Sequence, residues 1–234
     1  MKRFWAIMLC MVWVLVLAPT AVFAADEHFA FREVKIKETK VEYLVTGEAK
    51  VFEGTYHYLV RAGKQVLVKG HGRATAGAPK WGKWQQKITL SKEQIKGKKN
   101  VTLELYEKSA KDGKAVNQLI IPLNHPFGKE YQNRAFRHVK VAEPNVIYVV
   151  TGKARVFEGV YSYIVEDGHD VLVKGSGQAS AAAPAWGTFK QEIAIKKSKL
   201  PHNGSIILTL YQKDLSGRGA HLHSYSLQLD QFPW

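Results

Sequence analysis

The stretch VTGEAKVFEG at residues 45–54 returns as VTGKARVFEG at residues 150–159. The two stretches lie 105 residues apart (150 − 45 = 105), and at this spacing residues 31–90 align with residues 136–195. About 33 of the 60 aligned positions are identical, far more than unrelated segments share. The protein therefore consists of two copies of one module of about 100 residues.

The first 24 residues have the form of a secretory signal peptide. Lys2 and Arg3 precede an apolar run at residues 4–17, and small residues follow as far as Ala24. The run is shorter than the roughly 20 residues that span a bilayer, so we expect cleavage after Ala24 rather than an uncleaved membrane anchor. The only cysteine, Cys10, lies in this run, so the exported chain would have no disulfide and would depend on core burial.

The mature chain is strongly basic. Removal of Lys2 and Arg3 leaves 32 basic side chains (34 − 2) and 20 acidic ones, which is a net charge of +12 (32 − 20). Outside a cell membrane, this charge attracts polyanions such as teichoic acids, peptidoglycan carboxylates, anionic lipid and stray nucleic acid. The charge indicates a class of partner and not one partner. We expect a cell-wall polymer or an envelope protein, and we expect no specific nucleic acid.

Alternating apolar and polar residues predict short strands throughout both copies. Residues 31–36 and 41–46 are predicted as the first two strands of copy one, with Gly47 available for a turn. The longest predicted strands cover residues 51–61 and 156–166. On each of them, alternate residues are expected to share one buried face. In copy one these residues are Phe52, Gly54, Tyr56, Tyr58 and Val60, and in copy two they are Phe157, Gly159, Tyr161, Tyr163 and Val165.

About seven short strands per copy, with no helical periodicity, predict an all-β protein made of two tandem immunoglobulin-like β-sandwiches. The expected division is a signal peptide at 1–24, a first domain at 25–124, a linker at 125–133 and a second domain at 134–234. The linker contains Pro126 and Gly128, as linkers often do. Because it is short, we expect the two domains to be held in a fixed relation.

Three motifs cover nearly all of the mature chain. TGxAxVFEG occupies residues 46–54 and 151–159, and PxWGx followed by an aromatic residue occupies 79–84 and 184–189. A third motif begins with SAKDG at 109–113 in copy one. These motifs resemble the bacterial spore germination immunoglobulin-like domain, one of the Gmad domains. The resemblance implies an exported, non-catalytic module associated with germination, sporulation or the cell envelope, with no catalytic residue or cofactor.

The third motif is weaker in copy two. There the loop DLSGRGA at residues 214–220 replaces the Lys-Asp-Gly element, and Gln228 replaces Pro122. The resemblance therefore implies no role for this loop in copy two.

The motifs supply candidate site residues that also have structural interpretations. These residues are Phe52, Glu53, Trp81, Trp84, Phe157, Glu158, Trp186 and Phe189. One glutamate per module is not the pair of acids that a glycosidase needs, which favours a surface carboxylate paired with lysine or backbone amides. The tryptophans could stack on sugar rings. However, Trp81 and Trp84 are three residues apart, which favours one core residue and one surface residue.

No residue pattern supports catalysis or metal binding. His221 and His223 would lie on one face of a strand, but no cysteine, HExxH motif or carboxylate at metal spacing completes a zinc site. The sequence also lacks a GxSxG nucleophile elbow and a phosphate-binding loop. We therefore expect that the protein is not an enzyme and has no metal or cofactor.

Lysines after the same predicted strand of each copy are the strongest functional candidates. They are Lys92, Lys96, Lys98 and Lys99 in copy one and Lys196, Lys197 and Lys199 in copy two. The simplest interpretation is a solvated loop. The sharper hypothesis is that they bind an anionic wall polymer through salt-sensitive contacts. The expected role is a secreted or extracytoplasmic binding or scaffolding protein of the cell wall or spore. The alternative is an adaptor that docks a germination or wall-lytic complex by strand addition.

Overall fold

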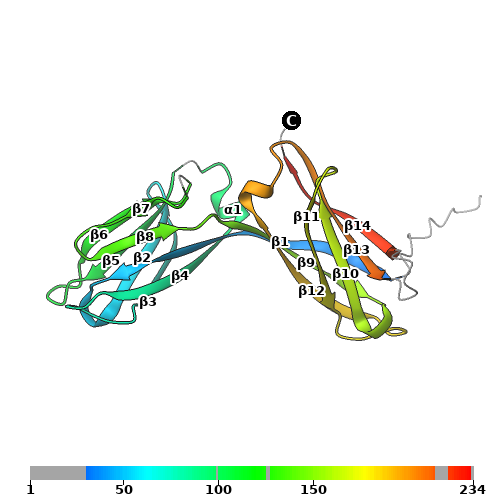
Figure 1. The fold of residues 1–234 in the computed structure, drawn as a ribbon, viewed down its shortest axis with the longest axis horizontal. Helices are drawn as coiled ribbons and strands as arrows, with labels where there is room; N and C mark the ends of the chain where they lie inside the picture. Colours follow the sequence, from blue (N-terminus) through cyan, green and yellow to red (C-terminus); the bar gives the residue numbers. More distant parts are fainter. Residues whose placement is uncertain (1–29, 99, 125–126, 214–220, 233–234) are drawn as a thin grey trace, which may run out of the picture.

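The computed structural model describes residues 30–98, 100–124, 127–213 and 221–232. The predicted signal peptide lies outside these ranges. The chain forms three antiparallel sheets with very little helix, which confirms the predicted all-β class (Figure 1). Across the described ranges, no helix has the length and apolar character needed to cross a membrane.

The strands fall into two similar series, one for each repeat. The first series is β1 (Phe31–Ala49), β2 (Thr55–Ala62), β3 (Gln65–Arg73), β4 (Gly82–Ser91), β5 (Val101–Lys108), β6 (Ala115–Pro122) and β7 (Glu130–Tyr131). The second is β8 (Phe136–Val141), β9 (Asn145–Ala154), β10 (Val160–Glu166), β11 (Val171–Gln178), β12 (Gly187–Lys196), β13 (Gly204–Lys213) and β14 (His221–Phe232).

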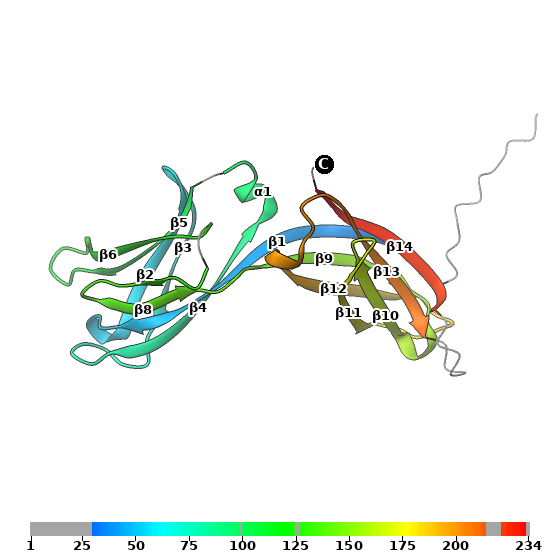
Figure 2. The same ribbon diagram turned by 45° about the horizontal axis from the view of Figure 1, so that its top comes forward.

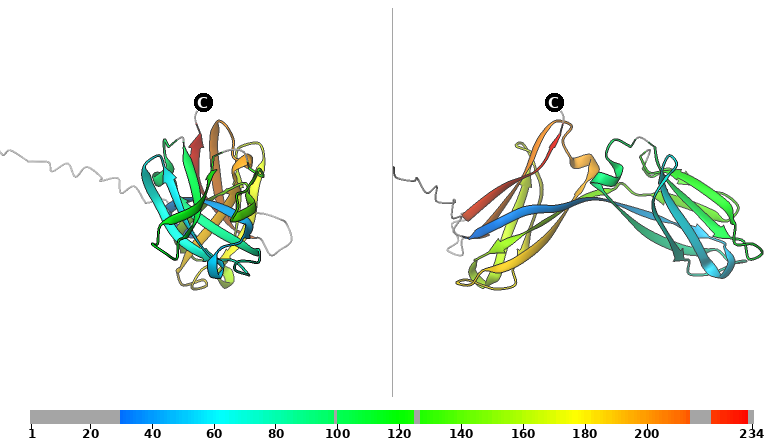
Figure 3. Two further views of the ribbon diagram at one scale, coloured as in Figure 1. Left: turned by 90° about the vertical axis from the view of Figure 1, so that its left-hand side faces the viewer. Right: turned by 180° about the vertical axis from the view of Figure 1, so that it is seen from behind.

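Each sandwich has one sheet of its own and shares the other. The separate sheets have the orders β3-β2-β5-β6 and β11-β10-β13-β14. The shared sheet has the order β12-β9-β1-β8-β7, with β4 also paired to β1. β1 runs the length of this sheet and enters both sandwiches (Figures 2 and 3).

The two repeats exchange their first strands. The first part of β1 pairs with β9 of the second repeat, from Phe31 opposite Ala154 to Glu42 opposite Asn145. The second part of β1 pairs with β4 of its own repeat, from Lys40 to Ala49. β8, which begins the second repeat, returns to the first sandwich and pairs with the second part of β1. Each sandwich is therefore completed by a strand from the other repeat.

The exchanged strands fill the cores that they enter. Phe31 is fully buried and meets Tyr161 edge-to-face, with ring centroids 6.1 Å apart. Phe136 is equally buried and meets Tyr56 in the same way at 6.5 Å. The boundary between the repeats therefore does not coincide with the boundary between the sandwiches. Part of the predicted linker is β7, which pairs with β8.

Two predictions about β1 were wrong. The two strands predicted at 31–36 and 41–46 are one strand, because residues 37–40 contain no glycine or proline and residues 38–40 pair with β9. Gly47 lies inside β1, opposite Trp84, and not in a turn. A Cβ at Gly47 would lie 3.0 Å from Val139 of β8, so this glycine permits the close approach of the exchanged strand.

The predicted burial of Phe52 and Phe157 was also wrong. Phe52–Gly54 and Phe157–Gly159 form 3-10 turns, and the following strands start only after them. The backbone of Glu53 is left-handed, with φ of 51°, and this conformation turns Phe52 away from the core. Phe52 and Phe157 are 65% and 55% exposed. From Tyr56 onward the predicted phase agrees with the structure, because Tyr56 and Val60 are buried.

Gly82, at the start of β4, lies directly against a loop. A Cβ at this position would be 2.3 Å from the amide nitrogen of Ala76 and 2.4 Å from its carbonyl oxygen. Because these atoms belong to the backbone, Gly82→Ala should destabilise the protein by about 1–3 kcal/mol, measured by urea unfolding. Gly63→Ala is the control, because its Cβ would meet nothing within 4 Å and only its positive φ opposes the change. Equal effects of the two changes would contradict the close contact at Gly82.

Candidate functional site

The predicted lysine segments meet at the junction of the two sandwiches. Ser91 ends β4 and caps the short helix α1 (Lys92–Ile95), accepting a hydrogen bond from the Gln94 amide at 3.2 Å. In the second repeat, the 3-10 turn η3 (Lys197–Lys199) follows β12, and the Lys197 amide donates to the Pro144 carbonyl at 3.0 Å. The strand exchange places α1 and η3 near one another (Figure 1).

The junction lysines differ in their partners. The Lys92 ammonium lies 2.6 and 2.7 Å from the two carboxylate oxygens of Asp230, and the Lys98 ammonium donates to the Gln65 side chain at 2.8 Å. Four other lysines are exposed and form no ion pair within the part of the chain that the structure describes. They are Lys96, Lys196, Lys197 and Lys199. Lys99 lies outside the described residues.

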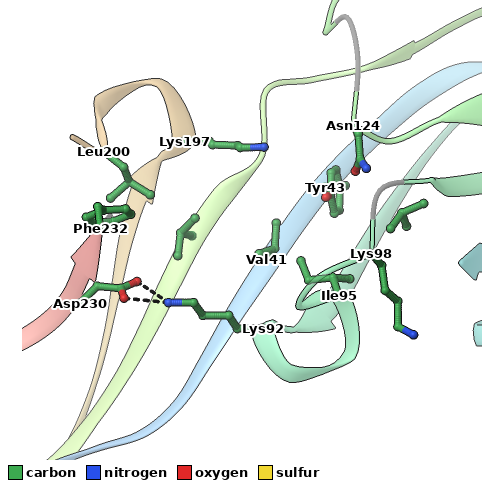
Figure 4. A pocket seen from close by; sticks show the side chains of 12 residues that line it. Val41, Tyr43, Lys92, Ile95, Lys98, Asn124, Lys197, Leu200, Asp230 and Phe232 are labelled. Atoms are coloured by element: carbon green, nitrogen blue, oxygen red, sulfur yellow. Dashed lines mark hydrogen bonds and ion pairs between the residues drawn. The ribbon is translucent and has the colours of Figure 1, made fainter. Parts of the chain in front are cut away.

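A cavity of about 400 Å³ opens between α1, η3 and the paired strands β1 and β9 (Figure 4). Its walls are largely apolar and come from both repeats. The apolar lining residues are Val41, Ile95, Val101, Val146, Leu200 and Phe232. The polar ones are Tyr43, Lys92, Lys98, Asn124, Lys197 and Asp230. The volume lies within the range of small-molecule sites, and the few polar groups among apolar walls are typical of such sites.

On one side of this cavity, Asp230 is held by two groups. Its carboxylate pairs with Lys92 and accepts a hydrogen bond from the hydroxyl of Tyr148 at 2.9 Å. Burial and the Asp230 carboxylate raise the pKa of Tyr148, so this hydroxyl stays protonated. Because Lys92 belongs to repeat one and Asp230 to repeat two, this cluster also links the repeats.

Trp84 and Phe189 belong to the sandwich cores. Trp84 is 5% exposed and packs on Tyr56 with ring centroids 4.8 Å apart, and Phe189 packs on Tyr161 at 4.9 Å. The buried Nε1 of Trp84 has no hydrogen-bond partner among the described residues.

Trp81 and Trp186 are half-buried and lie against cations. The Arg137 guanidinium is 4.3 Å from the Trp81 ring centroid, and the Arg32 guanidinium is 4.1 Å from that of Trp186. In both cases the arginine comes from the other repeat, so the contact secures an exchanged strand. Trp81 and Trp84 therefore do not share one flat platform for a sugar ring.

The remaining candidates lie away from the junction. The Phe52 amide donates to Glu107 at 3.3 Å, and the Phe157 amide donates to Gln212 at 3.2 Å. Glu53 and Glu158 are exposed at the tips of these turns. His221 stacks on Tyr211 at 3.7 Å, and no group of three possible metal ligands occurs in the described ranges.

A family model decides the identity of the repeats. The model Gmad2, the immunoglobulin-like domain of bacterial spore germination, matches residues 34–114 and 140–217. The chain belongs to the Gmad2 family. The two matches confirm the resemblance and the tandem immunoglobulin-like fold, and membership indicates a non-catalytic, germination-related domain. Each Gmad2 match begins inside an exchanged strand, so each family unit contributes to both sandwiches. No curated protein and no solved structure matches the chain.

Sequence reasoning found the lysines but missed the cavity between them. The lysine segments are visible because they align between the copies. The cavity is formed by residues from both repeats, and it exists only because the first strands are exchanged, for which the sequence offers little evidence. The one sequence signal for the exchange is that residues 37–40 and 142–145, which are equal in length, contain no glycine for a tight turn.

Proposed function

We propose that this Gmad2 protein is an exported, non-catalytic binding protein of the cell wall or spore that holds an anionic wall polymer at the junction of its sandwiches. The observation that supports this function is the meeting of exposed lysines from both repeats. Lys96 belongs to repeat one, whereas Lys196, Lys197 and Lys199 belong to repeat two. The net charge of +12 (32 − 20) expected for the exported chain favours the encounter with a polyanion.

The placement of the lysines has a consequence for affinity. A polymer segment that crosses the junction would contact lysines of both repeats without any rearrangement of a flexible linker. Binding at the second group would then be intramolecular, and the combined affinity would exceed that of either group alone. The contacts are between exposed charges, so they weaken as salt increases.

The adaptor alternative is supported by the sheet edges. β3, β6, β11 and β14 lie at the edges of the two separate sheets. Ile120 of β6 is 61% exposed. An edge with an exposed apolar side chain is suited to strand addition by a protein partner.

Co-sedimentation of residues 25–234 with purified cell-wall and cortex peptidoglycan tests the polymer proposal. We expect binding at low salt that falls steeply at moderate salt, and loss of binding when Lys96, Lys196, Lys197 and Lys199 are all changed to glutamine. The matched control changes four exposed lysines elsewhere, Lys64, Lys80, Lys111 and Lys174, to glutamine. Equal loss in both variants would show an effect of total charge and not of the junction. Absence of binding to every wall fraction would refute the polymer function and favour the adaptor.

A further inference from the structure

The junction cavity is surrounded by equivalent residues of the two repeats, but its two halves differ, since Tyr43 lines the cavity and its equivalent Tyr148 does not. Tyr43 corresponds to Tyr148, and Lys197 corresponds to Lys92, at the repeat spacing of 105 residues. The alignment between the two copies shifts by one residue before the last strand, so Asn124 is the counterpart of Asp230. One half therefore contains a carboxylate between a tyrosine and a lysine, and the other half has a neutral amide in that place.

Among the residues that the structure describes, the half with Asn124 offers two hydrogen-bond donors, Tyr43 and Lys197, and no carboxylate. Tyr43 is 96% buried (100 − 4), and its hydroxyl has no hydrogen-bond partner among the described residues, in contrast to Tyr148. Burial raises the pKa of Tyr43, so the hydroxyl is a donor at neutral pH. The Lys197 side chain extends toward Tyr43 and Asn124 (Figure 4), and its ammonium forms no ion pair within the described ranges.

We propose that this half of the cavity binds the carboxylate of a small amphipathic molecule. The carboxylate would lie beside the Asn124 amide, within reach of the Tyr43 hydroxyl and the Lys197 ammonium. Asp230 serves as the protein's own example of this geometry, with contacts of 2.6 Å to lysine and 2.9 Å to tyrosine. Hydrogen bonds between charged groups are shorter and stronger than neutral ones, so the two donors favour an anion over a neutral ligand.

The apolar walls determine the rest of the ligand. Val41, Val101 and Val146 are at most 8% exposed and present an apolar surface to the cavity. Contact with an apolar part of the ligand is favoured there, because it removes apolar surface from water. Ile95 and Leu200 lie at the rim, one from each repeat. A short alkyl or aromatic body therefore fits these walls. This ligand is a free small molecule, and its binding does not depend on the wall-polymer function.

Calorimetric titration of residues 25–234 with octanoate, below its micelle concentration, tests the proposal. We expect one octanoate per chain, with octanol, acetate and inorganic phosphate each binding about tenfold more weakly or worse. Octanol lacks the charge, whereas acetate and phosphate lack the apolar body. Equal binding of octanol would refute the role of the two donors, and absence of octanoate binding would refute the site.

Two substitutions make the test specific to this half of the cavity. Asn124→Asp should abolish octanoate binding and raise the melting temperature, because the new carboxylate would pair with Lys197 and Tyr43. Asp230→Asn is the matched control and should leave the stoichiometry at one octanoate per chain, because Tyr148 is fully buried and does not line the cavity. Octanoate binding that survives unchanged in Asn124→Asp would overturn the proposal, even if Asp230→Asn failed to fold. Because Lys96, Lys196 and Lys199 stay unpaired in Asn124→Asp, wall co-sedimentation should largely persist in it, which separates failure of this site from failure of polymer binding.

Discussion

Replacing Phe136 with alanine is expected to destabilise the first sandwich by about 3–5 kcal/mol, although Phe136 belongs to the second repeat. The side chain is fully buried and meets the Tyr56 ring in the core of that sandwich. Its removal would leave a cavity that the surrounding strands fill only in part. Phe31→Ala should have the reciprocal effect on the second sandwich, where Phe31 meets Tyr161.

Double-mutant cycles measured by urea unfolding distinguish the exchanged arrangement from a simple tandem. The pairs Phe136 with Tyr56 and Phe31 with Tyr161 should show interaction energies of about 0.5–3 kcal/mol, with leucine replacing each tyrosine. The crossed pairs, Phe31 with Tyr56 and Phe136 with Tyr161, are controls and should be additive within about 0.5 kcal/mol. Coupling in the crossed pairs would mean that each repeat keeps its own first strand.

Residues 38–142, expressed alone, should fold as a cooperative monomer, although this fragment is neither of the two repeats. It contains the second part of β1 together with β2 through β8, which are all the strands of the first sandwich. Residues 25–124 form a complete repeat but lack β8, so the Phe136 contact with Tyr56 is missing. Because small domains are stable by only about 5–15 kcal/mol, loss of this strand should abolish the cooperative transition or cause association between copies.

Urea unfolding and analytical ultracentrifugation of the two fragments check this expectation. A monomeric fragment 25–124 that is as stable as fragment 38–142 would show that residues 31–36 can fold back onto their own repeat. That result would contradict the requirement for strand exchange.

The fold class could be predicted from the sequence, but the strand exchange could not. Alternation of apolar residues and the internal repeat are local signals, and they led to two immunoglobulin-like sandwiches. The exchanged segments read FREVKI at 31–36 and FRHVKV at 136–141, with the same apolar positions. Each segment therefore fits either core equally well, and only the path of residues 37–40 and 142–145 decides between the two arrangements.

At the candidate site, features with a local sequence signal were predicted, whereas features that depend on backbone conformation or on the strand exchange were missed. The positive φ of Glu53 has no sequence signal, because glutamate is not a residue that favours this conformation, so the exposure of Phe52 was missed. The lysines were visible as aligned charges. Their meeting at one junction, and the equivalence of Asn124 with Asp230, depend on the exchange and on a one-residue register shift.

The shared strand β1 gives the molecule a mechanical property. Tension that draws the two sandwiches apart would load the β1–β9 ladder along its length, from the pair Phe31–Ala154 to the pair Glu42–Asn145. In this shear direction many hydrogen bonds bear the force together, whereas a flexible linker would simply extend. Resistance to forced unfolding depends on the unfolding rate and not on equilibrium stability alone. The angle between the two sandwiches is therefore set by backbone pairing and should resist extension.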